Sequence, residues 1–461
     1  MEQHKMKIIN PSTEDVISEV LCDNRETLSK KIQILKTGRV QWRNVELKER
    51  IAIVRGFSEL LEAERRHLCE ILSCEVGKPL SQSRNEITGA RTRIDWLINN
   101  AATYLSDEIM FSDDQIAEVI RYEPLGVICN ISAWNYPYLV GVNVFVTALL
   151  AGNAVMYKPS EYATLTGAEI NRLLLKAGVP ETVFQTAYGD RSTGECLLDL
   201  PFDGYFFTGS NRTGSYIYSR VAEKMVPCQC EMGGKDPLYV ADDVLSDIAR
   251  VASATADGAF YNNGQSCCAV ERIYVHERIY DEYVRVFLDE VQGYKIGDPF
   301  AEGVYIGPVA REEQRKILED QIKDAVSKGA RVLTGGKRMP GKGYYFEPTV
   351  VVDVNHDMRL MREESFGPVI GIMKVKSDAE AIEKMAETEY GLTAAVYCNN
   401  RKRAEDILDQ LDTGTGYWNC CDRVSASLPW SGRKHSGFGA MLSHAGFRAV
   451  VRPKAYHLRK S

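Results

Sequence analysis

Apolar residues recur every three or four positions in three long stretches near the N-terminus, residues 24–40, 46–75 and 82–104. In the second stretch, Ile51, Val54 and Phe57 would lie on one face of a helix. This period is typical of amphipathic α-helices. We therefore expect the chain to begin with a helical layer, interrupted at Gly77-Lys78-Pro79.

From residue 126 the pattern changes, because short apolar runs now alternate with helical segments. The first series predicts helices at 138–151, 164–177, 194–200 and 212–224, and strands at Val127–Ile131, Ala154–Tyr157, Val183–Ala187 and Gly204–Phe207. The second predicts helices at 245–260, 277–292, 311–328, 378–387 and 401–410, and strands at Leu238–Val240, Ile273–Val275, Val332–Leu333, Ile370–Val375, Ala394–Tyr397 and Gly416–Trp418. Such alternation indicates parallel sheets covered by helices, so the fold class is α/β with two units. The strand-like run Ala117–Tyr122 fits neither unit and suggests an edge extension or a subunit contact.

Composition narrows the class of protein. A chain of 461 residues is long enough for two or three domains, and its net charge of −7 gives no reason to expect nucleic acid or an anionic membrane as partner. The uncharged segment Pro124–Tyr157 contains prolines, glycines and asparagines, which favours a buried core over a membrane span. Twelve cysteines without the spacing of a disulfide framework or a zinc site indicate reduced thiols, so we expect a cytoplasmic protein with no metal. The N-terminal residues Met1–Lys5 contain no apolar run, so we expect no secretory signal.

Candidate chemistry is concentrated in the stretch Tyr261–Ala269, which reads YNNGQSCCA. It places Cys267 and Cys268 after a Gly-Gln turn, between a predicted helix and a predicted strand. A thiol at such a junction can face a cleft, where backbone N–H groups help to hold an anion. Taken alone, however, both cysteines are better explained as small buried hydrophobic residues, as most cysteines are.

Two further side chains could act in catalysis. Glu231 stands between apolar neighbours and before a glycine pair, so burial would raise its pKa toward the range of a general base. Asn135 follows a predicted strand and could donate to an oxyanion. The alternatives are a buried glutamate satisfied by backbone amides and an asparagine with a role in a turn.

Two strand ends of the first unit could bind a nucleotide. Lys158 and Glu161 close one strand and suit the hydroxyl groups of a ribose, although a solvated ion pair would look the same. Phe207–Gly214 reads as strand, glycine turn and helix start, where free N–H groups could face a pyrophosphate. Its glycines do not follow the GxGxxG spacing, so this motif alone is weak.

Together these motifs resemble the aldehyde dehydrogenase superfamily over nearly the whole chain. The segments concerned are Trp134-Asn135, Lys158–Glu161, Phe207–Gly214, Glu231–Lys235, Asn263–Cys267 and Glu363–Pro368, in the order and spacing of that family. The resemblance implies Cys267 as nucleophile, Glu231 as general base and Asn135 as oxyanion donor. It implies that NAD, or alternatively NADP, is bound by Trp134, Lys158, Ser160, Glu161, Gly209, Ser210, Gly214, Glu364 and Phe366.

The resemblance also implies an architecture and a reaction. Residues 1–105 and 126–233 would form a Rossmann-like NAD-binding domain, 234–446 a catalytic domain, and 106–125 with 447–461 a small β extension for assembly into a homodimer or homotetramer. The reaction would be NAD(P)-dependent oxidation of an aldehyde to a carboxylic acid through a cysteine thiohemiacetal and a thioester. The rivals are a semialdehyde-specific or coenzyme A-acylating enzyme and a catalytically silent NAD-binding protein.

The chain departs from the family pattern at two positions near the site. Ala133 replaces the proline expected before Trp134, and Val144 stands where many members carry a lysine or arginine thought to assist proton relay.

The predicted aldehyde pocket consists of Tyr136, Leu139, Val140, Cys268 and Arg423. Arg423 could pair with a substrate carboxylate. The aromatic residues could instead favour an aromatic or a cationic aldehyde.

Overall fold

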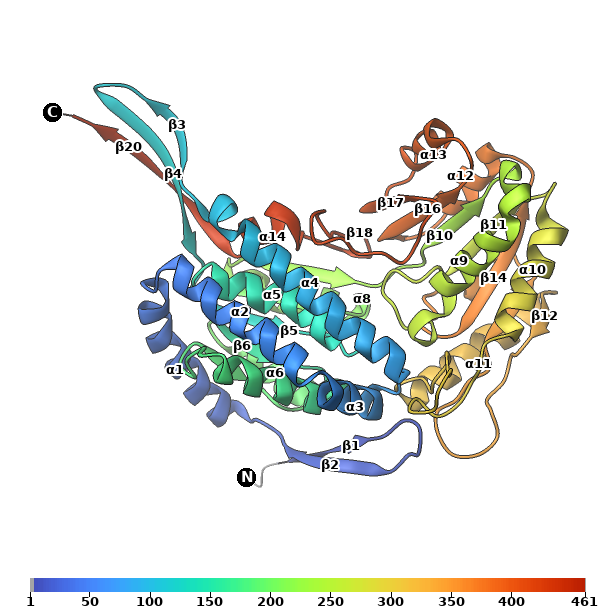
Figure 1. Ribbon diagram of the computed structural model, residues 1–461, viewed down its shortest axis with the longest axis horizontal. Helices are drawn as coiled ribbons and strands as arrows, with labels where there is room; N and C mark the ends of the chain where they lie inside the picture. The colour runs from blue at the N-terminus through green and yellow to red at the C-terminus, as the bar shows by residue number, and fades with distance from the viewer. Residues whose placement is uncertain (1–3, 461) are drawn as a thin grey trace.

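The computed structural model describes residues 4–460 and has two α/β bodies with a thin sheet that projects from one of them (Figure 1). The predicted fold class is therefore confirmed.

The first body is built on a six-stranded sheet. Its strand order is β19-β9-β8-β5-β6-β7, and every pair is parallel except the one that β19 forms with β9. The strands are β5 (Val127–Ile131), β6 (Ala154–Lys158), β7 (Phe184–Thr186), β8 (Gly204–Gly209), β9 (Cys228–Met232) and β19 (Gly437–Phe438). Its later helices are α5 (Pro137–Leu150), α6 (Thr164–Lys176), α7 (Arg191–Asp199), α8 (Asn211–Val221) and α14 (Ser443–Ala449).

The N-terminal helices pack on this sheet and share its hydrophobic core. They are α1 (Arg25–Arg43), α2 (Leu47–Ala63), α3 (Arg65–Val76) and α4 (Leu80–Leu105). The stretch 46–75 is helical as its spacing indicates, but it forms two helices that meet at Glu64, whose carboxylate accepts hydrogen bonds from Arg172 and Lys176 of α6. The hairpin of β1 (Lys5–Ile9) and β2 (Val16–Leu21) was not predicted.

The uncharged segment forms β5, α5 and β6 at the centre of the first body. All residues of α5 except Leu139 are buried, which explains why the helix is apolar on every face. Across residues 4–460, no helix is both long and apolar enough to cross a membrane.

The second body is built on a seven-stranded sheet of order β12-β13-β14-β11-β10-β16-β17, in which only β12 runs antiparallel to its neighbour. Its strands are β10 (Pro237–Val240), β11 (Arg272–His276), β12 (Arg331–Thr334), β13 (Thr349–Val352), β14 (Val369–Val375), β16 (Thr393–Tyr397) and β17 (Thr415–Trp418). Its helices are α9 (Ile248–Phe260), α10 (Tyr280–Gln292), α11 (Glu312–Ser327), α12 (Asp378–Ala386) and α13 (Arg401–Leu408). A two-residue pair, β15 (Tyr390–Gly391) with β18 (Arg433–Lys434), adjoins them.

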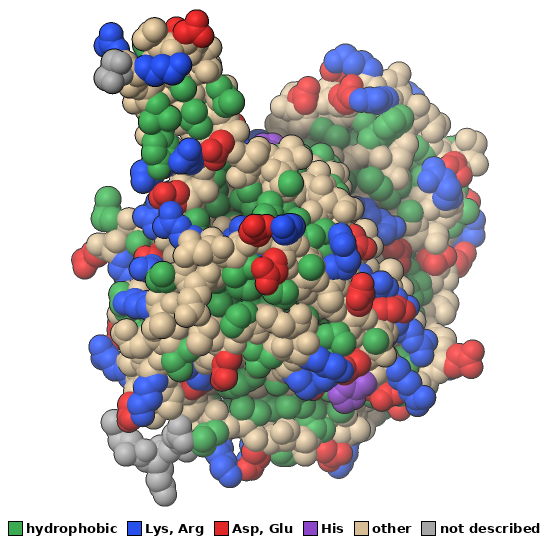
Figure 2. Space-filling view, turned by 60° about the vertical axis from the view of Figure 1, so that its left-hand side comes forward, with side chains coloured by type: hydrophobic (Ala, Val, Ile, Leu, Met, Phe, Trp, Pro, Cys, Tyr) green, Lys and Arg blue, Asp and Glu red, His purple; other side chains and the backbone are tan. Residues whose placement is uncertain are grey.

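The projecting sheet contains β3 (Glu108–Ser112), β4 (Ile116–Pro124) and β20 (Val451–Arg459), with β4 in the middle and both pairs antiparallel. Apolar side chains gather on it (Figure 2), and Ile109, Met110 and Phe111 are exposed. The extension therefore presents apolar surface and two free strand edges to its surroundings.

The chain returns to the first body before the predicted end of the catalytic domain at residue 446. β19 pairs with β9, and Met441 and Phe447 belong to the hydrophobic core of the first body. Residues 437–447 therefore pack with the first body.

Candidate active site

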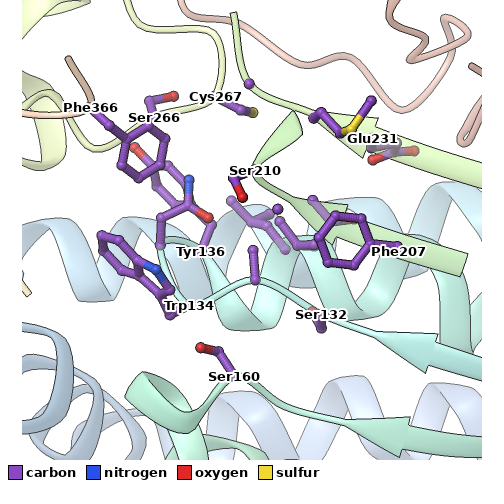
Figure 3. A pocket seen from close by; sticks show the side chains of 18 of the residues that line it. Ser132, Trp134, Tyr136, Ser160, Phe207, Ser210, Glu231, Ser266, Cys267 and Phe366 are labelled. Atoms are coloured by element: carbon purple, nitrogen blue, oxygen red, sulfur yellow. The ribbon is translucent and has the colours of Figure 1, made fainter. Parts of the chain in front are cut away.

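A cavity of about 1510 Å³ separates the two bodies and contains nearly all the predicted site residues. Its first wall is formed by the carboxyl ends of β5, β6 and β8, where a parallel sheet presents ligand-binding loops. Its second wall carries Cys267 and Phe366, which lie opposite Trp134 and Ser160 in Figure 3.

The nucleophile loop follows α9 in a left-handed turn. Asn262, Asn263 and Gly264 have φ values of 53°, 58° and 68°. Asparagine and glycine are the residues that adopt this conformation at least cost, which accounts for the sequence Asn-Asn-Gly.

Side-chain amides hold this turn in place. Asn263 Nδ2 donates to Pro308 O at 2.7 Å, and its Oδ1 accepts from Gly307 N at 2.7 Å. Gln265 Oε1 accepts from Ala310 N at 2.9 Å. These buried hydrogen bonds fix the backbone that presents Cys267.

The two cysteines differ in their surroundings. Cys267 is half-buried and faces the cavity, whereas Cys268 is buried and its Sγ donates to Asp422 Oδ1 at 3.0 Å. Contact with Cys267 and burial raise the pKa of the Cys268 thiol well above its ordinary value. Ser266 Oγ also donates to Asp422, at 2.7 Å. Cys267 is thus the more accessible of the two thiols.

Asn135 lies in the connection between β5 and α5, two residues before the helix, and is buried beside the loop that carries Cys267. Its Nδ2 donates to Gln265 O at 3.1 Å, and its own carbonyl oxygen accepts from Lys78 Nζ at 2.7 Å. Lys78 is fully buried, pairs with Glu86 and lies 3.9 Å from the ring centre of Tyr136. Glu86 in turn accepts from Tyr138 N at 2.9 Å, so one buried ion pair fixes both sides of the Asn135 turn.

Glu231 lies on β9 and is buried at the cavity wall. Burial raises its pKa to about 8, with an opposing effect from the Arg93 cation. Its Oε1 has no hydrogen-bond partner within residues 4–460. A carboxyl group with a free oxygen and a pKa near neutrality is suited to take a proton from water.

The first wall carries the donors and acceptors that fit a dinucleotide. Lys158 Nζ lies 3.9 Å from Glu161 Oε2 and donates to Pro159 O at 3.1 Å. Ser160 Oγ donates to Glu161 Oε2 at 3.3 Å. Both charged side chains line the cavity, so a cation and a carboxylate are available to the hydroxyl groups of a ribose.

The N-terminus of α8 supplies the site for a pyrophosphate. Gly209 and Ser210 line the cavity, and Ser210 does not cap the helix because its hydroxyl group donates to Thr213 Oγ1 at 3.1 Å. The first N–H groups of α8 therefore remain available for an anion. Gly214, also predicted to bind the cofactor, lies outside the cavity wall, and a Cβ there would come within 2.3 Å of Met232 Sδ. Its position serves the packing of α8 on β9.

Phe366 and Trp134 form the passage between the dinucleotide wall and Cys267. Their rings meet edge to face, with centroids 5.5 Å apart (Figure 3). Glu271 accepts from Phe366 N and Ser365 N at 2.9 Å each and from Lys235 Nζ at 2.5 Å, which stabilises the positive φ of 47° at Phe366. Glu364 precedes this segment and also lines the cavity.

The predicted aldehyde-pocket residues all line the cavity. Tyr136, Leu139 and Val140 come from the start of α5, and Cys268 lies beside the nucleophile. Arg423 is exposed, and its carbonyl group accepts a hydrogen bond from the Tyr417 hydroxyl group.

Sequence reasoning missed two groups of the site. In the sequence, Lys78 was assigned only to the break between two helices and Glu86 only to the following helix. No motif marks the two as a pair. Arg93 of α4 lines the cavity, and its cation opposes the rise in the pKa of Glu231. Its helical spacing was the only available signal, because it shares a face with Glu86 and Gly89.

The comparisons with known proteins agree with this geometry. A model of the "Aldehyde dehydrogenase family" matches residues 1–456. The chain belongs to the aldehyde dehydrogenase family. It is 34% identical over 459 residues to aminoaldehyde dehydrogenase 1, peroxisomal, from Pisum sativum, covering 97% of this chain and 91% of that protein.

Two solved structures extend the comparison to the fold. The structure of 3,6-anhydro-L-galactose dehydrogenase in complex with NAP is 30% identical with a TM-score of 0.94, covering 99% of this chain and 96% of that chain. Betaine aldehyde dehydrogenase from Staphylococcus aureus in complex with NAD+ is 28% identical with a TM-score of 0.94, covering 99% and 94%.

Family membership gives the reaction class. This aldehyde dehydrogenase is an oxidoreductase that oxidises an aldehyde to a carboxylic acid with NAD or NADP as cofactor.

Proposed function

We propose that this aldehyde dehydrogenase works through a thiohemiacetal and a thioester on Cys267, with water as the final acyl acceptor. The observation that carries the proposal is that one half-buried thiol, one buried amide and one buried carboxyl group line the same cavity. Cys267 attacks the carbonyl carbon as a thiolate, and the Asn135 amide and the Cys267 backbone N–H stabilise the oxyanion.

When bound, the nicotinamide cofactor would supply the hydride acceptor that oxidation of the thiohemiacetal to the thioester requires. Trp134, Lys158, Ser160, Glu161, Gly209, Ser210, Glu364 and Phe366 would hold it. Glu161 favours NAD, because its carboxylate would repel the 2′-phosphate of NADP.

Glu231 then removes a proton from the water that hydrolyses the thioester. Its buried position and raised pKa support this role, and a base beside the thioester favours water over coenzyme A as acceptor. The predicted proton-relay position, Val144, is buried in the core of the first body, so the nearby positive charge comes from Arg93 instead.

We further propose a cytoplasmic homodimer or homotetramer assembled through the projecting sheet. The exposed apolar side chains and free edges of β3 and β20 support the assembly. The twelve free thiols support a reducing compartment.

The nucleophile assignment is tested with Cys267→Ala and Cys268→Ala. NADH formation is followed with aliphatic, aromatic, amino and carboxy aldehydes, with and without coenzyme A. We expect Cys267→Ala to abolish turnover and Cys268→Ala to retain it, with carboxylate formed in the absence of coenzyme A. The reverse cysteine pattern would refute the assignment, and a strict need for coenzyme A would identify an acylating enzyme. No turnover with any aldehyde would favour a catalytically silent NAD-binding protein.

A further inference from the structure

Arg93 is a buried cation that forms no ion pair within 4.0 Å among residues 4–460, although Glu231 and Glu86 act on its charge from farther away. Only 9% of the residue is exposed, and Nη1 alone makes hydrogen bonds, to Asn143 Oδ1 at 3.0 Å and to Leu139 O at 3.3 Å. Both acceptors are neutral. Within the described chain, the Nε and Nη2 groups have no hydrogen-bond partner, although the side chain lines the cavity.

Other buried cations of the protein are compensated. Lys78 pairs with Glu86, and Lys235 pairs with Glu271 at 2.5 Å. Arg272 has no carboxylate but donates to five different residues through three nitrogen atoms. Because an uncompensated buried charge is costly, the free donors of Arg93 point to a ligand that arrives from outside the chain.

The position of Arg93 identifies which end of the cavity this ligand occupies. The guanidinium is bound by two α5 residues that line the cavity, Asn143 and Leu139, and Leu139 belongs to the predicted aldehyde pocket. Arg93 lines the same cavity as Cys267 and Glu231, and its cation opposes the rise in the pKa of Glu231. A ligand of Arg93 would therefore occupy the cavity that also contains Cys267.

We propose that Arg93 binds the carboxylate of an aldehyde substrate, so that the preferred substrates are ω-oxo acids. The proposal rests on the proposed function at Cys267. The planar guanidinium matches a carboxylate through two parallel N–H donors. The ammonium group of an aminoaldehyde, or the quaternary nitrogen of betaine aldehyde, would instead meet a like charge. This assigns carboxylate recognition to Arg93 rather than to the exposed Arg423.

The test compares 4-oxobutanoate, butanal and 4-aminobutanal as substrates, together with ω-oxo acids of other chain lengths. Wild type, Arg93→Gln and Arg93→Lys are measured with NAD. Arg91→Gln is the matched control, because Arg91 lies on the same helix as Arg93 but pairs with Glu62 of α2. We expect wild type to prefer the oxo acid. Arg93→Gln should lower the ratio of kcat/KM for 4-oxobutanoate to that for butanal by roughly ten- to a hundredfold. The same ratio for Arg93→Lys should lie between those of wild type and Arg93→Gln, and Arg91→Gln should keep the wild-type ratio.

A second measurement needs no turnover. Alkylation of Cys267 by iodoacetamide is followed by mass spectrometry in the presence of butanoate or of butanamide as the uncharged control. Protection by butanoate alone, lost in Arg93→Gln, supports the carboxylate site even if the panel shows no oxidation, in which case the proposed function is what fails. Oxidation of all aldehydes without preference for the oxo acids overturns the proposal. It is also overturned if Arg93→Gln lowers every kcat/KM equally and shifts the pH dependence of alkylation, since Arg93 would then position the thiolate.

Discussion

Replacing Glu231 by Gln isolates the deacylation step. The carboxyl group is buried, its pKa is raised to about 8, and Oε1 has no partner among the described residues. At pH 7 only about a tenth of it would be ionised, so wild-type deacylation should rise about tenfold per pH unit and level off above pH 8. The amide cannot take a proton, and loss of a general base costs about 10²- to 10⁴-fold.

The assay separates acylation from hydrolysis. Rapid mixing of enzyme, NAD and aldehyde should give Glu231→Gln a burst of NADH close to one per active site, followed by very slow turnover. Mass spectrometry of the quenched protein should show the acyl group on Cys267. A variant with no burst, or with wild-type steady-state rates, would refute the role of Glu231 as base for the second step.

The same pKa predicts a stability difference of defined sign. Because the folded-state pKa lies above 4.5, the folded protein binds the proton more tightly than the unfolded chain, so wild-type stability decreases as pH rises from about 4.5 to about 8. Glu231→Gln lacks this loss and should gain on wild type over that interval. At about 1.4 kcal/mol per pKa unit, the upper limit is about 5 kcal/mol. If the difference in Tm between Glu231→Gln and wild type were the same at pH 5 and at pH 8.5, the raised pKa would be contradicted.

Three other changes test the surroundings of the site. Lys78→Met leaves the Glu86 carboxylate buried without its cation and removes the donor to Asn135 O. The free energy of unfolding measured in urea should therefore fall by about 3–5 kcal/mol. A loss below about 1 kcal/mol would show that the ion pair is not needed for stability. Glu161→Ser should raise the ratio of kcat/KM for NADP to that for NAD by roughly tenfold, and an unchanged ratio would remove Glu161 from the ribose site. Phe111→Asp should reduce the mass measured by light scattering to that of a monomer; the proposed interface fails if the variant keeps the wild-type mass.

The fold was largely predictable because nearly all the strands within each of its two large sheets run parallel. Buried strands such as Val127–Ile131 read as short apolar runs, and the helices between them have a different period. The break at Glu64 was invisible, because no glycine or proline marks it and the ion pairs that accompany it come from α6. The strand β19 was equally hidden, since two residues carry no periodic signal.

The site was predictable as far as its residues lie in contiguous motifs. The Asn-Asn-Gly turn is recognisable in the sequence, because asparagine and glycine adopt its left-handed backbone conformation at least cost. Arg93 and Lys78 could not be found in this way, because their roles depend on which segments the fold brings against them. At Gly214 the close approach of Met232 gives a packing reason for glycine, and the predicted cofactor contact stays a prediction.

The pairing of β19 with β9 also has a consequence for synthesis of the chain. Glu231 lies opposite Gly437 in that pair, so the strand that carries the base gains its outer neighbour more than two hundred positions later in the sequence. While the ribosome makes the second body, β9 is an open edge beside an otherwise complete sheet, ready to pair with any extended segment. The nascent protein can therefore fold its dinucleotide wall early, but the base acquires its final setting only when the last residues have emerged.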